Sequence, residues 1–138
     1  MNYLGVDLGS KTLGLSISTS GIIASNLETY RFFENNYDMA IDYLVNKIEE
    51  LKIDEVILGL PKHMNNDLGI RGQISVDFKE KLENVVNVKV ILWDERLSTK
   101  TARIALSSQN KKKDKQKSLK DEIAAVVILQ GYLDYKNR

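Results

Sequence analysis

Acidic side chains border apolar segments at three places that lie far apart in the chain. They are, in chain order, Asp7 in GVDLG, Asp94 and Glu95 in WDER, and Asp121 in DEIAA. An aspartate inside an apolar strand is costly unless it has a partner. Carboxylate oxygens are the ligands that Mg²⁺ prefers, and two such ions can activate water and neutralise charge in phosphodiester hydrolysis. Together the acids indicate metal-dependent chemistry on a phosphate ester.

Each acid also has a plainer interpretation. Asp7 could be a hydrogen-bonded structural aspartate at a strand end. Neighbouring strand residues point to opposite faces, so Asp94 and Glu95 should not both enter one site, and alternation alone does not say which one does. Asp121 follows Ser118 by three residues, a spacing that fits the capping box at the start of a helix. Taken alone, that spacing favours capping over catalysis for Asp121.

Basic residues offer contacts for a phosphate. Gly9 permits a tight turn close to a bound phosphate, and Lys11 could meet it as a point charge. The run KKKDKQK, residues 111–117, carries five lysines and predicts a basic surface loop, which could equally be an ordinary solvated loop. The single histidine, His63, cannot build a histidine-rich metal site. The segment GVDLGSKT nearly matches a P-loop, but Ser10 replaces its second glycine and the pattern is strand-turn-strand, which excludes a P-loop NTPase.

Length and composition set broad bounds. The chain has 138 residues, 43% of them hydrophobic, which suffices for one domain spanning residues 1–138. The absence of cysteine excludes disulfides and thiolate-zinc sites and suits a reducing compartment. The N-terminus has no signal-like pattern, and the longest apolar run, 123–129, is too short to span a bilayer. We therefore expect a soluble, cytoplasmic protein with no membrane partner.

The pattern of apolar residues predicts the elements that must position these side chains. Three antiparallel strands are expected at the start of the chain, over 3–8, 13–18 and 22–32. A helix over 36–51, a buried strand over 55–60, a helix with Ile70, Ile74, Phe78 and Leu82 on its core face, and a strand over 88–93 follow. A short helix to about residue 107 and a last helix from 119 to about 135 complete the chain. Helix and strand alternation implies parallel pairing, hence an α/β fold.

Four segments carry a family resemblance. They are LGVDLGSKTLGLSIS, GLPKHMNNDLGIRGQ, VILWDERLST and KDEIAAVVILQGYL, in this order along nearly the whole chain. The chain resembles the bacterial YqgF family, also called RuvX-like, of the RNase H-like superfamily. The resemblance implies an RNase H-like fold, with a five-stranded mixed sheet flanked by helices. It also implies a nuclease that uses a divalent metal, Mg²⁺ or Mn²⁺.

The resemblance also assigns site residues. It makes Asp7, Glu95 and Asp121 the catalytic acids and metal ligands, and so selects Glu95 over Asp94. Before the third acid the family usually has a glycine and an apolar residue, where this chain has Ser118-Leu119-Lys120, so the capping interpretation of Asp121 stays open. The candidate nucleic-acid contacts are the basic residues of the matched segments and of the lysine run: Lys11, Arg71, Arg96, Arg103, Lys111, Lys112 and Lys113.

Two activities are assigned to the family, and the sequence separates them poorly. The first hypothesis is an RNA endonuclease that trims the 5′ leader of precursor 16S ribosomal RNA, free or ribosome-associated. The alternative is a Holliday junction resolvase, which would need a two-fold dimer to cut symmetric strands of branched DNA. A third hypothesis is a nucleic-acid-binding protein that has lost catalysis. The sequence is compatible with a monomer or a homodimer.

Overall fold

The computed structural model describes residues 1–61, 69–94 and 113–138, with side chains in the last segment from residue 123 onward. Its elements are β1 (Tyr3–Leu8), β2 (Thr12–Ser18), β3 (Ser25–Arg31), α1 (Tyr37–Glu50), β4 (Glu55–Leu60), α2 (Gly69–Val85), β5 (Lys89–Asp94) and α4 (Lys113–Lys136). The predicted short helix before residue 107 lies outside the described residues.

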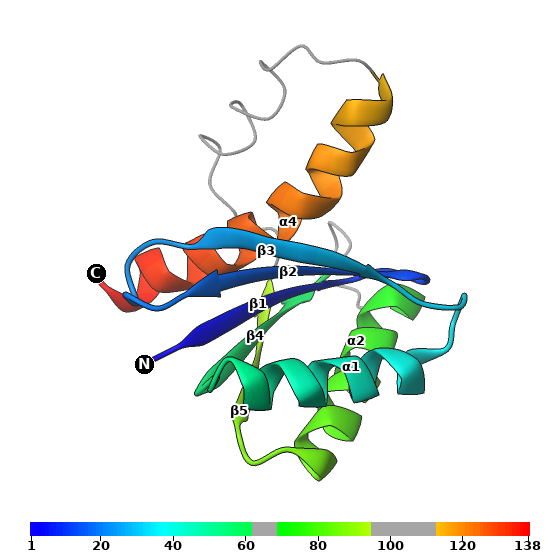
Figure 1. Cartoon of the computed structure of the whole chain (residues 1–138), viewed down its shortest axis with the longest axis horizontal. Helices are drawn as coiled ribbons and strands as arrows, with labels where there is room; N and C mark the ends of the chain where they lie inside the picture. Colours follow the sequence, from blue (N-terminus) through cyan, green and yellow to red (C-terminus); the bar gives the residue numbers. More distant parts are fainter. Residues whose placement is uncertain (62–68, 95–112) are drawn as a thin grey trace.

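The strands form one mixed sheet. Its five strands have the order β3-β2-β1-β4-β5. The β1–β2 and β2–β3 pairs are antiparallel, whereas β1–β4 and β4–β5 are parallel. Helices α1 and α2 cover one face and α4 covers the other (Figure 1). The predicted fold class, three antiparallel strands followed by parallel ones, is confirmed.

Strand alternation divides the core into two clusters. The larger cluster lies between the sheet and helices α1 and α2, and it takes Leu4, Val6 and Leu8 from β1. The smaller cluster lies between the sheet and α4, and it takes Tyr3 from β1 together with Leu129 and Leu133 from the helix. The position of a β1 residue in the sequence therefore determines which helix layer its side chain faces.

The start of α1 and the first hairpin have local causes. The Asn36 side chain caps α1 by accepting a hydrogen bond from the Met39 amide at 3.2 Å. In the β1–β2 turn, the Gly9 amide donates to the Thr12 carbonyl at 2.8 Å. This segment runs strand-turn-strand, as predicted, and so it cannot form the strand-loop-helix of a P-loop.

Two details of the predicted third strand and second helix are wrong. The third strand begins at Ser25, because Ser20 turns the chain by accepting hydrogen bonds from the amides of Ile22 and Ile23, both at 3.1 Å. Ile70 is 80% exposed, because α2 packs through Gly72, Ser75, Phe78 and Leu82. An apolar pattern cannot reveal a helix face that is partly made of small residues.

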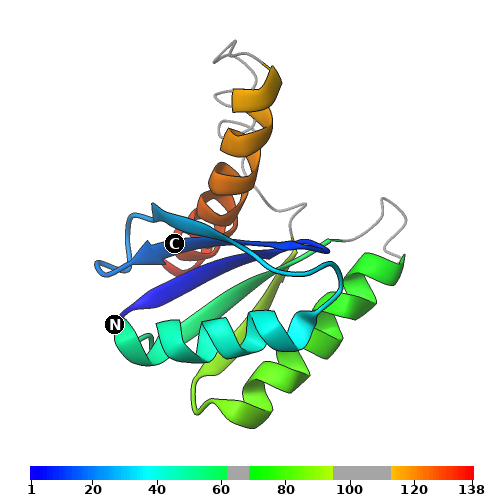
Figure 2. The same cartoon turned by 45° about the vertical axis from the view of Figure 1, so that its right-hand side comes forward.

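The last helix begins at Lys113 rather than at residue 119. Lysine, glutamine and glutamate are good helix formers, so a charged run need not be a loop. Ser118 and Asp121 consequently lie inside α4, and the capping-box interpretation of Asp121 is wrong. Figure 2 shows the first turns of α4 rising away from the sheet.

Close packing of α4 on the sheet depends on Gly5. The buried Ser16 hydroxyl, on the neighbouring strand, donates to the Ala125 carbonyl at 2.7 Å. A Cβ atom on Gly5 would overlap Ser16 Oγ and would lie 2.8 Å from Leu129 Cβ and 2.9 Å from the Ala125 carbonyl oxygen. The close approach of α4 to the sheet therefore needs a glycine on the strand opposite.

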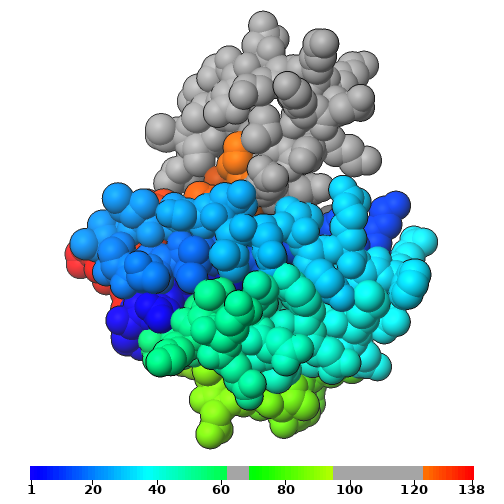
Figure 3. Space-filling view, in the orientation of Figure 1, coloured from blue at the N-terminus to red at the C-terminus, as the bar shows by residue number. Residues whose placement is uncertain are grey.

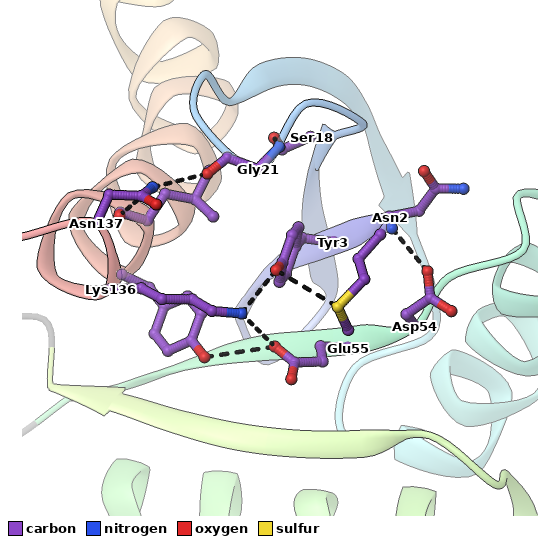
Figure 4. Close-up of polar contacts among 11 residues, drawn as sticks. Asn2, Tyr3, Ser18, Gly21, Asp54, Glu55, Lys136 and Asn137 are labelled. Carbon is purple, nitrogen blue, oxygen red and sulfur yellow. Dashed lines mark hydrogen bonds and ion pairs between the residues drawn. The ribbon is translucent and has the colours of Figure 1, made fainter.

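A second contact holds the carboxyl-terminal end of α4. Lys136 Nζ donates to the Tyr3 hydroxyl at 2.7 Å and lies 3.9 Å from a Glu55 carboxylate oxygen (Figure 4). Tyr132 donates to the same carboxylate at 3.3 Å. Burial, followed by the Glu55 charge, raises the pKa of Tyr132 above its ordinary value of 10.0. We call these four residues, Tyr3, Glu55, Tyr132 and Lys136, the α4 anchor.

Gly5→Ala should destabilise the protein. The added methyl group meets buried neighbours that cannot all move, and overpacking of this kind costs about 1–3 kcal/mol. Urea unfolding would measure the loss, with Glu50→Ala on the exposed end of α1 as the control. An unchanged midpoint for Gly5→Ala would contradict the close packing of α4.

The α4 anchor should make stability fall at alkaline pH. The raised pKa of Tyr132 means that the unfolded chain loses this proton first, so stability falls as the pH rises above about 10. The pKa of Lys136 is also raised, because its ammonium group donates to Tyr3, and it acts in the same direction.

Tyr132→Phe keeps the ring but removes the titrating hydroxyl. Urea unfolding at neutral and alkaline pH should show a smaller alkaline loss for this variant than for the wild type. Burial also raises the pKa of Tyr43, so part of the alkaline loss should remain. Identical pH profiles for the two proteins would exclude a contribution from Tyr132.

Candidate active site

Asp7 lies near the carboxyl end of β1, one residue before the strand ends. It is half-buried and pairs with Gly14 across the antiparallel ladder. Tyr3 belongs to the cluster under α4, and alternation puts Gly5 and Asp7 on that same face. The Asp7 carboxylate therefore lies at an edge of the sheet and on the side covered by α4.

The segments that follow the parallel strands begin at this edge of the sheet. The strands β1, β4 and β5 all run in one direction, and β3 does too because it is antiparallel to β2. Their carboxyl ends meet at one edge, which is where α/β proteins preferentially bind ligands. Asp94, the last residue of β5, also lies at this edge.

Asp94 does not share a face with Asp7. In β5, Val90 and Leu92 pack in the cluster under α1 and α2, whereas Ile91 and Trp93 pack under α4. By alternation Asp94 follows Val90 and Leu92. The sequence pattern left open whether Asp94 or Glu95 shares a site with Asp7. Asp94 is disfavoured, because it points to the opposite side of the sheet. Glu95 lies outside the described residues.

Helix α4 runs antiparallel to β1. Tyr3 contacts Lys136 near the end of the helix, and Gly5 lies against Ala125 and Leu129. Moving along β1 toward its carboxyl end therefore moves backward along α4. Asp121 belongs to α4 and precedes Ala125 by four residues, about one helical turn.

Two of the predicted basic residues lie at the carboxyl end of β1. Arg71, in the first turn of α2, donates to the Leu8 carbonyl at 3.2 Å and to the Tyr37 hydroxyl at 3.4 Å. Lys11 is exposed in the β1–β2 turn. Lys113 is the first residue of α4, but its side chain is outside the described part, as are the whole of Arg96, Arg103, Lys111 and Lys112.

Tyr37 is a residue that sequence reasoning missed. It accepts the hydrogen bond from Arg71, which is 34 residues away, and donates to the Asn35 side chain at 3.3 Å. Its position in the apolar stripe of α1 indicated only a core residue. No pattern in the sequence connects the starts of α1 and α2.

The donor set suits a hard divalent cation. Asp7, Glu95 and Asp121 would offer carboxylate oxygens only, the ligand type that Mg²⁺ and Mn²⁺ prefer. Over residues 1–61 and 69–94 and the side chains from residue 123 onward, no group of three acidic or histidine residues could hold a metal ion. Two members of the proposed set fall outside that search. In the same part of the chain, no helix is both long and apolar enough to cross a membrane.

Comparison with known proteins agrees with this architecture. The family model described as "RuvX: Holliday junction resolvase" matches residues 1–135. A protein of Onion yellows phytoplasma (strain OY-M) is 56% identical over 133 residues, which cover 96% of this chain and 88% of the relative. A protein of Staphylococcus epidermidis (strain ATCC 12228 / FDA PCI 1200) is 46% identical, covering 95% and 94%. Both relatives are named "Putative pre-16S rRNA nuclease".

Among solved structures, the chain resembles Thermus thermophilus RuvC in complex with a Holliday junction substrate. The TM-score is 0.67, and the match covers 99% of this chain and 95% of RuvC at 13% identity. At that identity the likeness shows the fold alone, and it confirms the predicted RNase H-like fold. The family match and the identity to the bacterial relatives show more: this chain is a member of the RuvX family, also called YqgF.

Proposed function

We propose that this protein is a divalent-metal-dependent endonuclease that processes the 5′ end of precursor 16S ribosomal RNA. The observation that carries the proposal is the half-buried Asp7 at the carboxyl edge of the sheet, on the face covered by α4. The relatives with 56% and 46% identity, named pre-16S rRNA nucleases, support the choice of substrate. The proposal treats residues 1–138 as one cytoplasmic nuclease domain.

The proposed catalytic residues are Asp7, Glu95 and Asp121. Asp94 points away from the Asp7 face, so the next residue in the sequence, Glu95, is the better partner. Asp121 belongs to α4, whose backbone leads toward the carboxyl end of β1. Its place inside the helix removes the capping role that competed with catalysis.

These three acids would hold Mg²⁺ or Mn²⁺. When bound, the metal would supply an activated water and neutralise charge on the phosphodiester. Asp7 is already held in the sheet by the pairing of β1 with β2, so its backbone would need no rearrangement to act as a ligand. Such rigid support is what a metal-binding carboxylate requires.

The basic residues would bind the phosphates of the RNA. Lys11 and Arg71 flank the carboxyl end of β1, and Arg71 is oriented by Leu8 and Tyr37. The remaining candidates are Arg96, Arg103, Lys111, Lys112 and Lys113. Contacts of this kind position the nucleic acid but do not read its sequence.

A Holliday junction is the second candidate substrate. The matching family model carries the description of a Holliday junction resolvase. Symmetric cutting of a four-way junction would need a two-fold dimer. A nucleic-acid-binding protein without catalysis is the third possibility, and the same assay separates all three.

A competition assay tests the proposed function. Ribosome-associated precursor 16S RNA and a four-way DNA junction would be offered together with Mg²⁺ or Mn²⁺. We expect cleavage of the RNA alone and its loss on chelation. Symmetric cuts in the junction would instead establish the resolvase, and no cut in either substrate would favour the non-catalytic binder.

Asp7→Asn should reduce cleavage by about 10²–10³-fold, the range found when one group that stabilises transition-state charge is removed. Glu95→Gln and Asp121→Asn should have comparable effects. Asp94→Asn is the matched control, because the same chemical change is made at the same edge but on the opposite face. Loss of activity in Asp94→Asn with full activity in Glu95→Gln would reverse the assignment of these two acids.

A further inference from the structure

An aromatic side chain is exposed at the same edge as Asp7. Phe33 follows β3, and 76% of its surface is open to solvent. The preceding residue, Phe32, is 6% exposed and packs in the cluster under α1 and α2. The core therefore buries Phe32 and leaves the Phe33 ring exposed to water. Burial of Phe33 consequently contributes little to the stability of the fold.

The backbone around Phe33 is fixed by hydrogen bonds to the first hairpin. The Phe32 amide donates to the Lys11 carbonyl at 3.0 Å, and the Asn35 amide donates to the Ser10 carbonyl at 2.7 Å. The Asn36 amide closes the turn on the Phe33 carbonyl at 2.8 Å. Because the turn is already ordered, a ligand that stacks on the ring would lose little affinity to ordering of the loop.

Three basic residues belong to segments that are connected to the Phe33 turn, either through the chain or through hydrogen bonds. Lys11 and Arg31 are exposed, and within the described part of the chain neither has an ion-pair partner. Arg71 is linked to the Phe33 turn through hydrogen bonds from its guanidinium to Tyr37 and from Tyr37 to Asn35.

Two acids lie near these cations. Glu34 is exposed next to Phe33, and Asp38 is paired with Lys81 at 3.1 Å. Among the described residues, Glu34 has no ion-pair partner, so one unpaired acid stands against the three cations Lys11, Arg31 and Arg71 in these segments. We call Lys11, Phe33 and Arg71 the Phe33 platform.

The Phe33 platform lies at the same edge of the sheet as the candidate active site. The carboxyl ends of β1 and β3 lie at one edge, with β2 between them. Asp7 pairs with Gly14, so Lys11 lies about 10 Å further along the strand direction, and β3 lies about 10 Å to the side of β1. In Figure 3 the cyan segment after β3 forms an open surface at the right of the molecule. A strand of nucleic acid that reaches Asp7 can therefore also reach this surface.

We propose that Phe33 stacks on an unpaired base of the nucleic-acid substrate while Lys11 and Arg71 contact the flanking phosphates. The inference rests on the proposed nuclease function and adds the requirement for a single-stranded segment beside the cleavage site. A ring among cations is the arrangement by which proteins bind single strands without reading sequence. Phe33 is a substrate-binding residue, and it takes no part in the chemical step.

The test measures binding without metal, so that cleavage does not interfere. Fluorescein-labelled single-stranded RNA is titrated with the wild type and with Phe33→Ala in the presence of chelator, and anisotropy is recorded. Stacking on one base predicts binding about 5- to 100-fold weaker for Phe33→Ala, and near wild-type binding for Phe33→Trp. Ile22→Ala is the matched control, since Ile22 is 63% exposed but lies in the β2–β3 turn, at the other edge of the sheet.

Tryptophan fluorescence tests directly whether a base stacks at position 33. The chain's one tryptophan, Trp93, is 8% exposed and should respond little to a ligand at Phe33. Emission from Phe33→Trp should be quenched by unlabelled RNA, because a base stacks on the new indole. Emission from Ile22→Trp should change little. In the cleavage assay, Phe33→Ala should raise KM and leave kcat unchanged, as expected for lost substrate binding.

Several results would overturn the inference. Equal RNA affinity for Phe33→Ala and wild type would do so, as would an unquenched Phe33→Trp. Sedimentation that shows a wild-type dimer dissociated by Phe33→Ala would assign the ring to a second copy of the chain instead. The proposed function can fail separately: quenching of Phe33→Trp by RNA, with no cleavage of precursor RNA by the wild type, would support the platform and reject the nuclease.

Discussion

The absence of a side chain at Gly5 determines how α4 lies on the sheet. Because β1 offers no Cβ atom there, Ala125 and Leu129 come into direct contact with the strand, and Ser16 can reach the Ala125 carbonyl. The α4 anchor adds a second fixed point at the other end of the helix. Together, the Gly5 contact and the α4 anchor fix the direction in which α4 runs past the rest of β1. The third proposed acid belongs to this helix, and its placement depends on contacts that contain no catalytic group.

The direction of the strands explains why unrelated segments gather at one edge. Four strands, β1, β3, β4 and β5, end there, so the segments that follow them begin there. Asp7, the Phe33 turn and Asp94 occupy three of these ends, and Arg71 of α2 also reaches the end of β1 through its bond to the Leu8 carbonyl. These residues are far apart in the sequence, and pairing of the strands brings them to one edge of the sheet. The topology of the sheet therefore places the proposed site residues at this edge.

The sequence predicted the structural features that depend on the apolar pattern. It missed the features that depend on the packing of small or polar side chains. Strands β1 and β4 have the predicted bounds because they are continuous apolar runs. The predicted start of the last helix is wrong because a run of charged residues is compatible with a helix as well as with a loop. Alternation predicted that Asp94 and Glu95 differ in face, but the layer that each face meets required the packing of Val90 and Trp93. Phe32 and Phe33 are chemically identical, so only the structure could show which ring is buried.

The distribution of charge at the edge follows from what a polyanion needs. A carboxylate set repels the phosphate backbone until cations neutralise it, so the acids alone would weaken binding of substrate. Lys11, Arg31 and Arg71 belong to other elements but lie at the same carboxyl-terminal edge of the sheet as Asp7. Because Arg71 is held by Leu8 and Tyr37, its charge stays near the end of β1 instead of collapsing onto the acid. In the proposed site, this separation of acids from cations would let one surface attract the nucleic acid while the neighbouring carboxylates bind the metal.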